Sequence, residues 1–318
     1  MKLISESSQL IFDAALKKGV NVKIISKRFN LIRLVYKQKD FFIRNTSFPV
    51  NSQTSCMIAN NKFLTKKVME SFNIPMPKSW LVKTPAGAKK LVLKKNLYPC
   101  VLKPAKGAHG HKVYVNINSF EEFSELLPFV FTKPSHNNVL IEEYVEGKDY
   151  RLLVIDNKVC AVMERVPAHV VGDGINNIGQ LIKKFNKNPL VGKRYEKPMC
   201  KIVINAEVGR NLKKQGKKFS DIPEIEKKIF LRQNANISTG GIGIDVTDNV
   251  CQSVKDLAIR ATKAIGMVIS GVDIIYNEKT KKAYVLEIND TPGIDIHHYP
   301  VFGKPRMVAD SIVDYLIA

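Results

Sequence analysis

Three oxygen-bearing side chains near the carboxyl end of the chain could hold a hard cation. Asp273 lies in the apolar run GVDIIYN, and Glu287 and Asn289 lie in the next apolar run, AYVLEIN. Side chains alternate along a strand, so Glu287 and Asn289 share one face, and a hairpin can bring Asp273 opposite them. Magnesium takes carboxylate and amide oxygens and leaves positions for phosphate and water. The alternative is an ordinary polar strand face, and this pattern alone leaves both interpretations open.

A glycine-bearing loop follows the strand-like segment that ends at Lys103, in the sequence VLKPAKGAHGHKV. Gly107 and Gly110 would let backbone N–H groups approach phosphate oxygens, and Lys103 and Lys106 would add positive charge. The segment matches neither the G-K-[ST] phosphate loop nor the dinucleotide-binding glycine fingerprint. A plain hairpin with a glycine-bearing turn is the alternative.

Two further segments carry polar groups that suit a nucleotide and a reacting carboxylate. In LIEEYVEGKDYR, the backbone of a short connector could bind an adenine edge, and the carboxylate of Asp149 could bind ribose hydroxyls. In LRQNANISTGGIGIDVTD, Arg232 and Asn234 precede a turn that contains Gly240 and Gly241. Positive charge, amides and backbone N–H groups together suit an oxyanion or a transferring phosphoryl group. The alternative is a capped turn with a surface arginine.

The elements that position these residues alternate between helix and strand, which predicts an α/β or α+β fold. Gly19 ends the first helix, prolines follow the second, and Ser119 with Glu122 forms a capping pattern for the fourth. We expect helices at 8–19, 61–73, 85–96, 119–131 and 309–317. We expect strands at 20–26, in hairpins at 31–46 and 265–289, at the ends of 98–117, and at 138–166 with a turn at Asp156-Asn157.

Length and composition describe a soluble globular protein of more than one lobe. The chain has 318 residues, of which 45% are hydrophobic and 25% are charged,. No apolar run approaches the roughly 20 residues that span a bilayer, and Glu6 and Asp13 interrupt the first segment, which argues against a secretory signal. Five scattered cysteines without a C-x-x-C pair argue against a disulfide framework or a zinc site,. We therefore expect a cytoplasmic protein without membrane partners.

The formal net charge of +21 predicts attraction to anions,. The excess is mostly lysine in small clusters, which are usually solvated faces. Nucleic-acid binding is therefore disfavoured as the main function, and the charge is compatible with the use of a nucleotide.

The order of these motifs resembles that of the ATP-grasp superfamily: a lysine helix, a K-P strand with a glycine loop, an E-x-Y-V connector, a T-G-G loop and a D…E-x-N hairpin. The segments NKFLTKKVMESFNIPMP, DYRLLVIDNKVCAVMERVPAHVVGDG and LRQNANISTGGIGIDVTD resemble the ATP-grasp modules of cyanophycin synthetase and of bifunctional γ-glutamylcysteine/glutathione synthetase. The ending HHYPVFGKPR is more similar to the second. The resemblance covers nearly the whole chain.

The resemblance implies a three-lobed ATP-grasp fold with ATP between two antiparallel sheets. The implied lobes are an N-terminal lobe at 1–60, a central lobe at 61–148, and a C-terminal catalytic lobe at 149–318 with a lysine-rich insert at about 172–228. Two Mg²⁺ ions, or Mn²⁺ in their place, are the implied metals, with Asp273, Glu287 and Asn289 as their ligands.

The resemblance also implies roles for residues in the other motifs. The set that would bind ATP comprises Lys62, Lys103, Lys106, Gly107, Gly110, Glu142, Glu143, Tyr144, Val145 and Asp149. The set that would face the acyl phosphate comprises Arg232, Asn234, Gly240 and Gly241. The candidates for binding substrate carboxylates are Arg165, His298, Lys304 and Arg306.

The implied activity is an ATP-dependent carboxylate–amine ligase that forms a peptide or amide bond through an acyl phosphate. The substrates would be amino acids or short peptides, and related enzymes are often homo-oligomers. Both relatives carry a companion module that this sequence lacks, which predicts a stand-alone ligase. One alternative is a glutathione-synthetase-like ligase that adds glycine to γ-glutamylcysteine. Another is a non-catalytic module that binds nucleotide or RNA.

Overall fold

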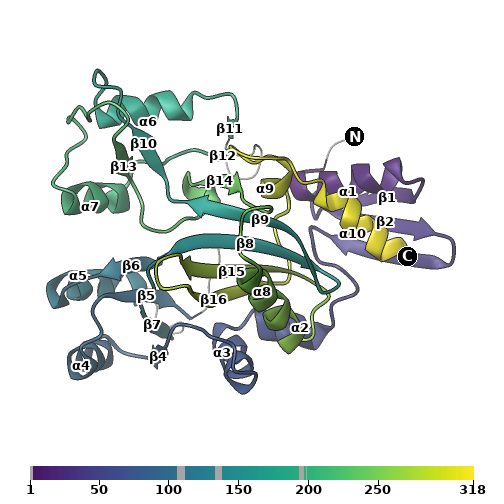
Figure 1. Cartoon of the computed structure of the whole chain (residues 1–318), viewed down its shortest axis with the longest axis horizontal. Helices are drawn as coiled ribbons and strands as arrows, with labels where there is room; N and C mark the ends of the chain where they lie inside the picture. Colours follow the sequence, from purple (N-terminus) through teal and green to yellow (C-terminus); the bar gives the residue numbers. More distant parts are fainter. Residues whose placement is uncertain (1–2, 106–111, 133–137, 193–196, 198) are drawn as a thin grey trace.

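The computed structural model describes residues 3–105, 112–132, 138–192, 197 and 199–318. Its described strands form five sheets, of which three are large and two have only two strands. Figure 1 shows the two largest sheets facing one another, with the N-terminal lobe on the right and a small helical unit at the upper left.

The N-terminal lobe is a three-stranded antiparallel sheet covered by the first and last helices of the chain. The helix α1 (Glu6–Lys17) begins where Ser5 accepts a hydrogen bond from the Ser8 N–H. The strands β1 (Asn21–Ser26), β2 (Leu31–Tyr36) and β3 (Lys39–Arg44) pair in sequence order. The hairpin of β2 and β3 was predicted, whereas the pairing of β1 with β2 was not. The helix α10 (Val308–Ile317) packs beside α1, so both ends of the chain share one core.

The central lobe is a four-stranded antiparallel sheet in the order β4-β7-β5-β6, covered by two helices. Its strands are β4 (Ser79–Val82), β5 (Cys100–Pro104), β6 (Tyr114–Ile117) and β7 (Val139–Glu143). The helices α4 (Pro85–Lys95) and α5 (Phe120–Val130) bury Phe123 and Leu127 against this sheet. Ser119 caps α5 by accepting from the Glu122 N–H at 3.2 Å, which confirms the predicted capping pattern.

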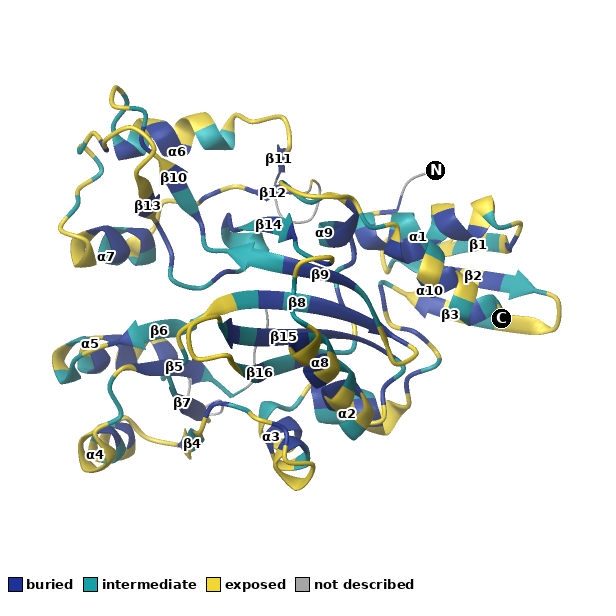
Figure 2. Ribbon diagram, in the orientation of Figure 1, coloured by how far each residue is buried: buried dark blue, intermediate teal, exposed yellow. Residues whose placement is uncertain are grey.

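The C-terminal lobe is a five-stranded antiparallel sheet in the order β14-β9-β8-β15-β16. Its strands are β8 (Lys148–Ile155), β9 (Lys158–Val166), β14 (Ile242–Asp245), β15 (Ile269–Asn277) and β16 (Lys282–Asn289). The turn between β8 and β9 has Asp156 and Asn157 at positive φ, which is the hairpin conformation expected of these residue types,. Figure 2 shows β8 and β15, two of the three inner strands, buried over most of their length.

Three helices cover one face of this sheet: α2 (Gln53–Ala59), α3 (Lys62–Ser71) and α8 (Gln252–Ala264). Met69 of α3 is fully buried in the same core as Leu257 and Val272. The helix α3 follows the predicted lobe boundary at residue 61, yet it packs on the C-terminal sheet. Neither α2 nor α8 was predicted from the sequence, although the buried positions of α8 recur every three or four residues,.

The predicted insert is a separate small unit with its own apolar core, made of β10 (His169–Val171), α6 (Ile178–Asn186), β11 (Val191–Gly192), β12 (Met199–Cys200), α7 (Ala206–Lys214) and β13 (Lys228–Phe230). Its helix α7 contacts the central lobe. The Arg210 guanidinium lies 5.5 Å from the ring centre of Tyr114 and 5.3 Å from that of Phe129. Lys214 of the same helix forms an ion pair with Glu122. These contacts bridge the insert to the central sheet.

Candidate active site

A cleft of about 1160 Å³ lies between the central and C-terminal sheets. Residues of all three lobes and of the insert line it, including the predicted residues Lys62, Lys103, Glu142, Glu143, Tyr144, Val145, Asp149, Arg165, Asn234, Asp273, Glu287 and Asn289. Lys106, Gly107 and Gly110 lie outside the residues that the structure describes. The cleft therefore gathers most of the described predicted site residues in one place.

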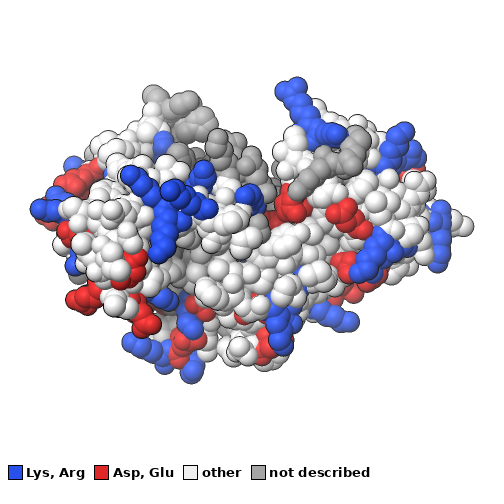
Figure 3. Space-filling view, turned by 90° about the horizontal axis from the view of Figure 1, so that it is seen from above, with Lys and Arg blue, Asp and Glu red and all other residues white. Residues whose placement is uncertain are grey.

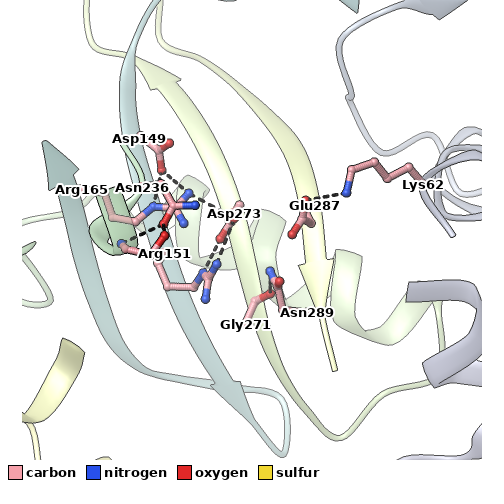
Figure 4. A network of polar contacts seen from close by, with 10 residues as sticks. Lys62, Asp149, Arg151, Arg165, Asn236, Gly271, Asp273, Glu287 and Asn289 are labelled. Carbon is pink, nitrogen blue, oxygen red and sulfur yellow. Dashed lines mark hydrogen bonds and ion pairs between the residues drawn. The ribbon is translucent and has the colours of Figure 1, made fainter. Parts of the chain in front are cut away.

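Four charged residues form a network on the cleft face of β8, β9 and β15 (Figure 4). Strand register places Asp149 opposite Arg165 and Asp273 opposite Arg151. Arg151 donates to both carboxylate oxygens of Asp273, with Nη2 to Oδ2 at 3.1 Å. Arg165 lies 3.1 Å from Asp273 Oδ2 and donates to Asp149 Oδ1 at 2.6 Å. The two arginines therefore hold both carboxylates in fixed positions.

Burial and the arginines act in opposite directions on these two carboxyl groups. Burial alone would raise the pKa of Asp273, but the guanidiniums of Arg151 and Arg165 outweigh it and lower that pKa. Burial raises the pKa of Asp149, and the negative charge of the neighbouring Asp273 acts in the same direction, so that the opposing effect of Arg165 is outweighed. Arg151 was not predicted as a site residue. Its alternation with Asp149 along one strand was the only signal in the sequence, and such alternation is common.

The hairpin of β15 and β16 brings the three predicted metal ligands together as the alternation suggested. Asp273 pairs in register with Glu287, and Asn289 pairs with Gly271. Lys62 of α3 donates to Glu287 Oε2 at 3.0 Å. The Asn289 side-chain N–H donates to the Gly271 carbonyl at 3.2 Å. This bond leaves the Asn289 side-chain oxygen available as a metal ligand.

The chemistry of this set fits magnesium. Two carboxylates and an amide are hard oxygen ligands, and they supply fewer contacts than Mg²⁺ requires, as expected where phosphate and water complete the shell. The part of the chain that the structure describes has no group of three His, Cys, Asp or Glu residues suited to a metal, so a metal at this hairpin would need Asn289 as a further protein ligand. Arg151, Arg165 and Lys62 meanwhile neutralise the same carboxylates.

A buried ion triad lies where α3 meets the central sheet. The carboxylate of Glu142, which is 3% exposed, lies 2.9 Å from Lys66 Nζ and 2.6 Å from Lys103 Nζ. Burial would raise the pKa of Glu142, but the two ammonium groups outweigh this effect and lower it. Glu142, which was predicted to belong to the ATP-binding set, thus positions Lys103. Lys66 was not predicted as a site residue.

The connector between β7 and β8 lines the cleft with Tyr144 and Val145. The Tyr144 N–H donates to the Pro99 carbonyl at 3.2 Å, so β5 holds the connector in place. Gly147 then passes against β15, where a Cβ atom would lie 2.5 Å from the Tyr276 carbonyl oxygen. The connector can follow this path only with glycine at that position.

Replacing Gly147 by alanine is therefore expected to destabilise the fold by about 1–3 kcal/mol, because the backbone of β15 cannot yield as a flexible side chain can. The matched control is Gly209→Ala within α7, where no atom lies within 4 Å of the added carbon. That control should stabilise the protein by about 0.5–1 kcal/mol, as alanine does in a helix. Urea unfolding of both variants measures the difference, and equal stability would contradict the close contact.

The Thr-Gly-Gly loop contributes to the cleft through residues that differ in part from those predicted. Asn234 lines the cleft, and its amide oxygen and nitrogen are buried without a hydrogen-bond partner among the described residues. Asn236 and Ser238 also line the cleft, and Figure 4 shows Asn236 beside Arg165. Arg232 instead forms a 2.6 Å ion pair with Glu207 and does not line the cleft.

Gly240 and Gly241 shape this loop and are not among the residues that line the cleft. Gly240 adopts a φ of 97°, in the left-handed region that favours glycine,. A Cβ atom on Gly241 would lie 2.9 Å from the carbonyl oxygens of Asn236 and Val166. Both glycines thus hold Asn236 and its neighbours at the cleft rather than face it themselves.

Of the four substrate-binding candidates, the structure brings only Arg165 to the cleft lining. His298 is buried and accepts a hydrogen bond from the Ala309 N–H at 3.1 Å, which ties it to α10. Lys304 lies 3.2 Å from Asp248, and Arg306 lies 2.8 Å from Asp245. Local acidic partners thus hold Lys304 and Arg306 away from the cleft, and we find no support for carboxylate binding by these three residues.

The neighbouring His297 is buried, at 1% exposure, and neither of its ring nitrogens has a hydrogen-bond partner among the described residues. Burial, together with the positive charge of Arg151, lowers the pKa of His297 to about 3. Between the usual value of 6.5 and about 3, the unfolded chain binds a proton that the folded chain does not. Stability contributed by neutral His297 is therefore lost as pH falls through this window.

Replacing His297 by leucine is expected to leave stability at pH 7 unchanged or to raise it by about 1 kcal/mol, since an unsatisfied buried polar group is removed. Between pH 6.5 and about 3, the unfolding free energy of the unmodified chain changes with pH in part because His297 takes up a proton on unfolding,. The leucine variant should lose this contribution, which corresponds to up to one proton. Urea unfolding across this range measures the slope. An unchanged slope in the variant would show that His297 does not titrate as described.

The described helices include none with the length and apolar character needed to cross a membrane.

Comparisons with known proteins identify the family of this chain and agree with its fold. A family model for the RimK-like ATP-grasp domain matches residues 59–178 and 196–301, so the chain belongs to this family. The chain is 34% identical to the glutathione biosynthesis bifunctional protein GshAB of Clostridium perfringens, over 98% of this chain and 41% of the relative. It is 31% identical to cyanophycin synthetase of Trichormus variabilis, over 98% of this chain and 35% of the relative.

Comparison with solved structures also finds ATP-grasp proteins of similar fold. The bifunctional glutathione synthetase from Pasteurella multocida superposes with a TM-score of 0.71 at 29% identity, over 98% of this chain and 43% of that one. D-alanine–D-alanine ligase from Bacillus anthracis has a TM-score of 0.52 at 15% identity, over 84% of this chain and 69% of that one, and shows the fold alone. The chain spans less than half the length of the bifunctional relatives it matches. The predicted family resemblance and fold class are confirmed.

Proposed function

We propose that this chain is an ATP-dependent carboxylate–amine ligase that forms a peptide or amide bond through an acyl phosphate. The observation that carries the proposal is one cleft that holds Lys62, Lys103, Asp273, Glu287 and Asn289 between two antiparallel sheets. These residues come from three separate segments, and an ATP-grasp fold is the setting in which such a set binds nucleotide and metal.

Within this proposal, the two lysines bind ATP phosphates and the connector at Tyr144 and Val145 contacts adenine. Asp273, Glu287 and Asn289 would hold two Mg²⁺ ions, which would neutralise charge on the reacting phosphates. Asp149 binds the ribose. Lys62, Arg151 and Arg165, which contact the same carboxylates, lie where they can add positive charge for the phosphate oxygens.

The chemistry that remains for the protein is mainly positioning and charge stabilisation. A carboxylate is a poor electrophile until phosphorylation provides a leaving group. When an amine attacks, negative charge develops on the carbonyl oxygen. Arg165 and the amide of Asn234, which has no hydrogen-bond partner among the described residues, both line the cleft and suit this role. We assign Arg232, Gly240 and Gly241 a supporting role in holding that loop.

A glutathione-synthetase-like activity is the second candidate, with γ-glutamylcysteine as the carboxylate and glycine as the amine. It is favoured by the names of the relatives that cover nearly all of this chain, the glutathione biosynthesis protein and the bifunctional glutathione synthetase. Both relatives are more than twice as long as the part matched, so their substrates do not transfer directly. The same cleft serves either reaction.

A screen of ADP release over pairs of amino acids and dipeptides, with mass spectrometry of the products, tests both candidates. The expected result is ADP formation that requires Mg²⁺ and one specific pair of substrates. Turnover with γ-glutamylcysteine and glycine would select the second candidate. ATP binding without ADP release for any pair, together with RNA binding that weakens as salt rises, would instead favour a non-catalytic module.

A further inference from the structure

The open face of the N-terminal sheet carries a pattern that the ligase cleft does not explain. On β2 and β3, the side chains of Ile32, Leu34 and Ile43 are buried beneath α1 and α10. The alternate positions point to the opposite face, which no described helix covers,. Register places Lys23, Arg33 and Phe42 side by side across the three strands, and all three are exposed.

This lobe holds a concentrated part of the positive charge of the chain. Residues 21–44 contain seven basic residues and one acidic residue, a net charge of +6 within 24 positions. All seven are exposed, namely Lys23, Lys27, Arg28, Arg33, Lys37, Lys39 and Arg44. Figure 3 shows the molecule from above, with further Lys and Arg side chains over the insert. The insert is therefore a suitable control surface for effects of charge alone. A surface of this charge binds anions.

Two phenylalanines lie among these cations and remain more than half exposed. Phe29 is 53% exposed and Phe42 is 54% exposed. The guanidiniums of Arg28 and Arg44 lie 5.7 Å and 6.0 Å from the ring centre of Phe29. Arg33 lies 6.0 Å from the ring centre of Phe42, where an ion pair with Asp40 holds it. Phe42 lies on β3, and Phe29 lies in the turn between β1 and β2. Each exposed ring has at least one arginine beside it.

The form of this surface distinguishes between possible occupants. A second copy of the chain would bring a net +6 against another net +6, and like charges oppose that contact. An extended peptide adds to the edge of a sheet through its backbone, whereas the cations and rings here lie on the face and in the turn between β1 and β2. Single-stranded nucleic acid has phosphates for the cations and flat bases for the rings, and such proteins combine basic grooves with aromatic stacking platforms.

We propose that the open face of β1, β2 and β3, together with the turn between β1 and β2, binds single-stranded nucleic acid. The cations Lys23, Arg28 and Arg44 contact phosphates. The rings of Phe29 and Phe42 stack with bases. This surface borders the ligase cleft, which Asn30 and Asn45 help to line, and the binding does not depend on the proposed ligase activity.

Fluorescence anisotropy with labelled 30-nucleotide oligo(U) and oligo(dT), between 50 and 300 mM NaCl, tests the proposal. The double variant Lys23→Gln, Arg44→Gln should lower the slope of log affinity against log salt by about 1.4, since each phosphate contact to a single strand contributes about 0.7. The variant Phe29→Ala, Phe42→Ala should weaken binding at least fivefold, with little change in slope. The matched control removes two exposed lysines of the insert, Lys183→Gln with Lys187→Gln, and should bind like the unmodified chain.

Three outcomes would overturn the proposal. The first is no binding of either oligonucleotide at 50 mM NaCl. The second is an equal loss in the insert control, which would show general charge attraction. The third is binding that survives loss of both phenylalanines and is displaced equally well by poly-glutamate, which would indicate an acidic protein partner. The thermal unfolding midpoint should be the same in all variants, since the substituted side chains are exposed.

Discussion

Replacing Glu287 by alanine is expected to lower ADP-forming turnover at least about 10²-fold, because the variant loses a carboxylate that places positive charge at the transferring phosphoryl group. Glu287 faces Asp273 across the hairpin and contacts only one cation, Lys62, among the described ion pairs. Its removal should therefore affect metal and phosphate binding more than stability. Calorimetric titration of ATP with Mg²⁺ should show weaker binding alongside the lost turnover.

The control for this prediction lies on the same hairpin. Glu278 is an exposed glutamate in the β15–β16 turn that pairs with Lys148 at 2.9 Å. Glu278→Ala removes the same charge from a position outside the cleft lining and should retain turnover within about twofold, as surface ion pairs contribute little. Retained turnover in Glu287→Ala would show that the metal assignment is wrong while leaving the fold unaffected.

Replacing Glu142 by alanine is expected to destabilise the protein by about 3–5 kcal/mol at pH 7, since it leaves the buried ammonium groups of Lys66 and Lys103 without their counterion. Both lysines are less than 10% exposed, so water cannot replace the carboxylate. The adjacent Glu143 is the matched control, because its nearest cation, Lys78, lies 3.5 Å away at the surface. Glu143→Ala should change stability by less than about 0.5 kcal/mol.

The pH dependence provides a second measurement of the same triad. Because the pKa of Glu142 is lowered from its usual value of 4.5, its contribution is fully present above that value and is lost as pH falls through the lowered pKa,. The stability difference between the unmodified chain and Glu142→Ala should therefore shrink in acid. Urea unfolding at pH 7 and at pH 4 measures both quantities. A difference that grows in acid would contradict an ionised Glu142.

Local patterns predicted much of the fold, because strands and helix ends obey short-range rules. Alternation in β16 placed Glu287 and Asn289 on one face, and the hairpin aligned Asp273 with Glu287 as expected. Ser119 formed its cap with the residue three positions later. These features depend on residues close in the chain, so the sequence contains the information directly. The family resemblance extended this to the overall fold.

Contacts between distant segments could not be predicted from such patterns. Arg151 meets Asp273 only because β8 lies beside β15 in the sheet, although 122 residues separate the two. Arg306 was a reasonable carboxylate binder from its charge, but its partner Asp245 lies 61 residues earlier. Lys66 became part of the triad because α3 meets β7 of the central sheet, although 76 residues separate Lys66 from Glu142. Sheet order and helix docking decide these pairs, and neither has a local signal.

The candidate metal ligands show the same difference between local patterns and contacts of distant segments. By itself, the sequence determined that Asp273, Glu287 and Asn289 lie on paired strands with oxygen atoms toward one face, since alternation is a property of the strand itself. Only the tertiary structure decided which cations hold these ligands before a metal binds. Arg151, Arg165 and Lys62 reach them from β8, β9 and α3. Charge attraction selects partners by distance in space, and folding sets that distance.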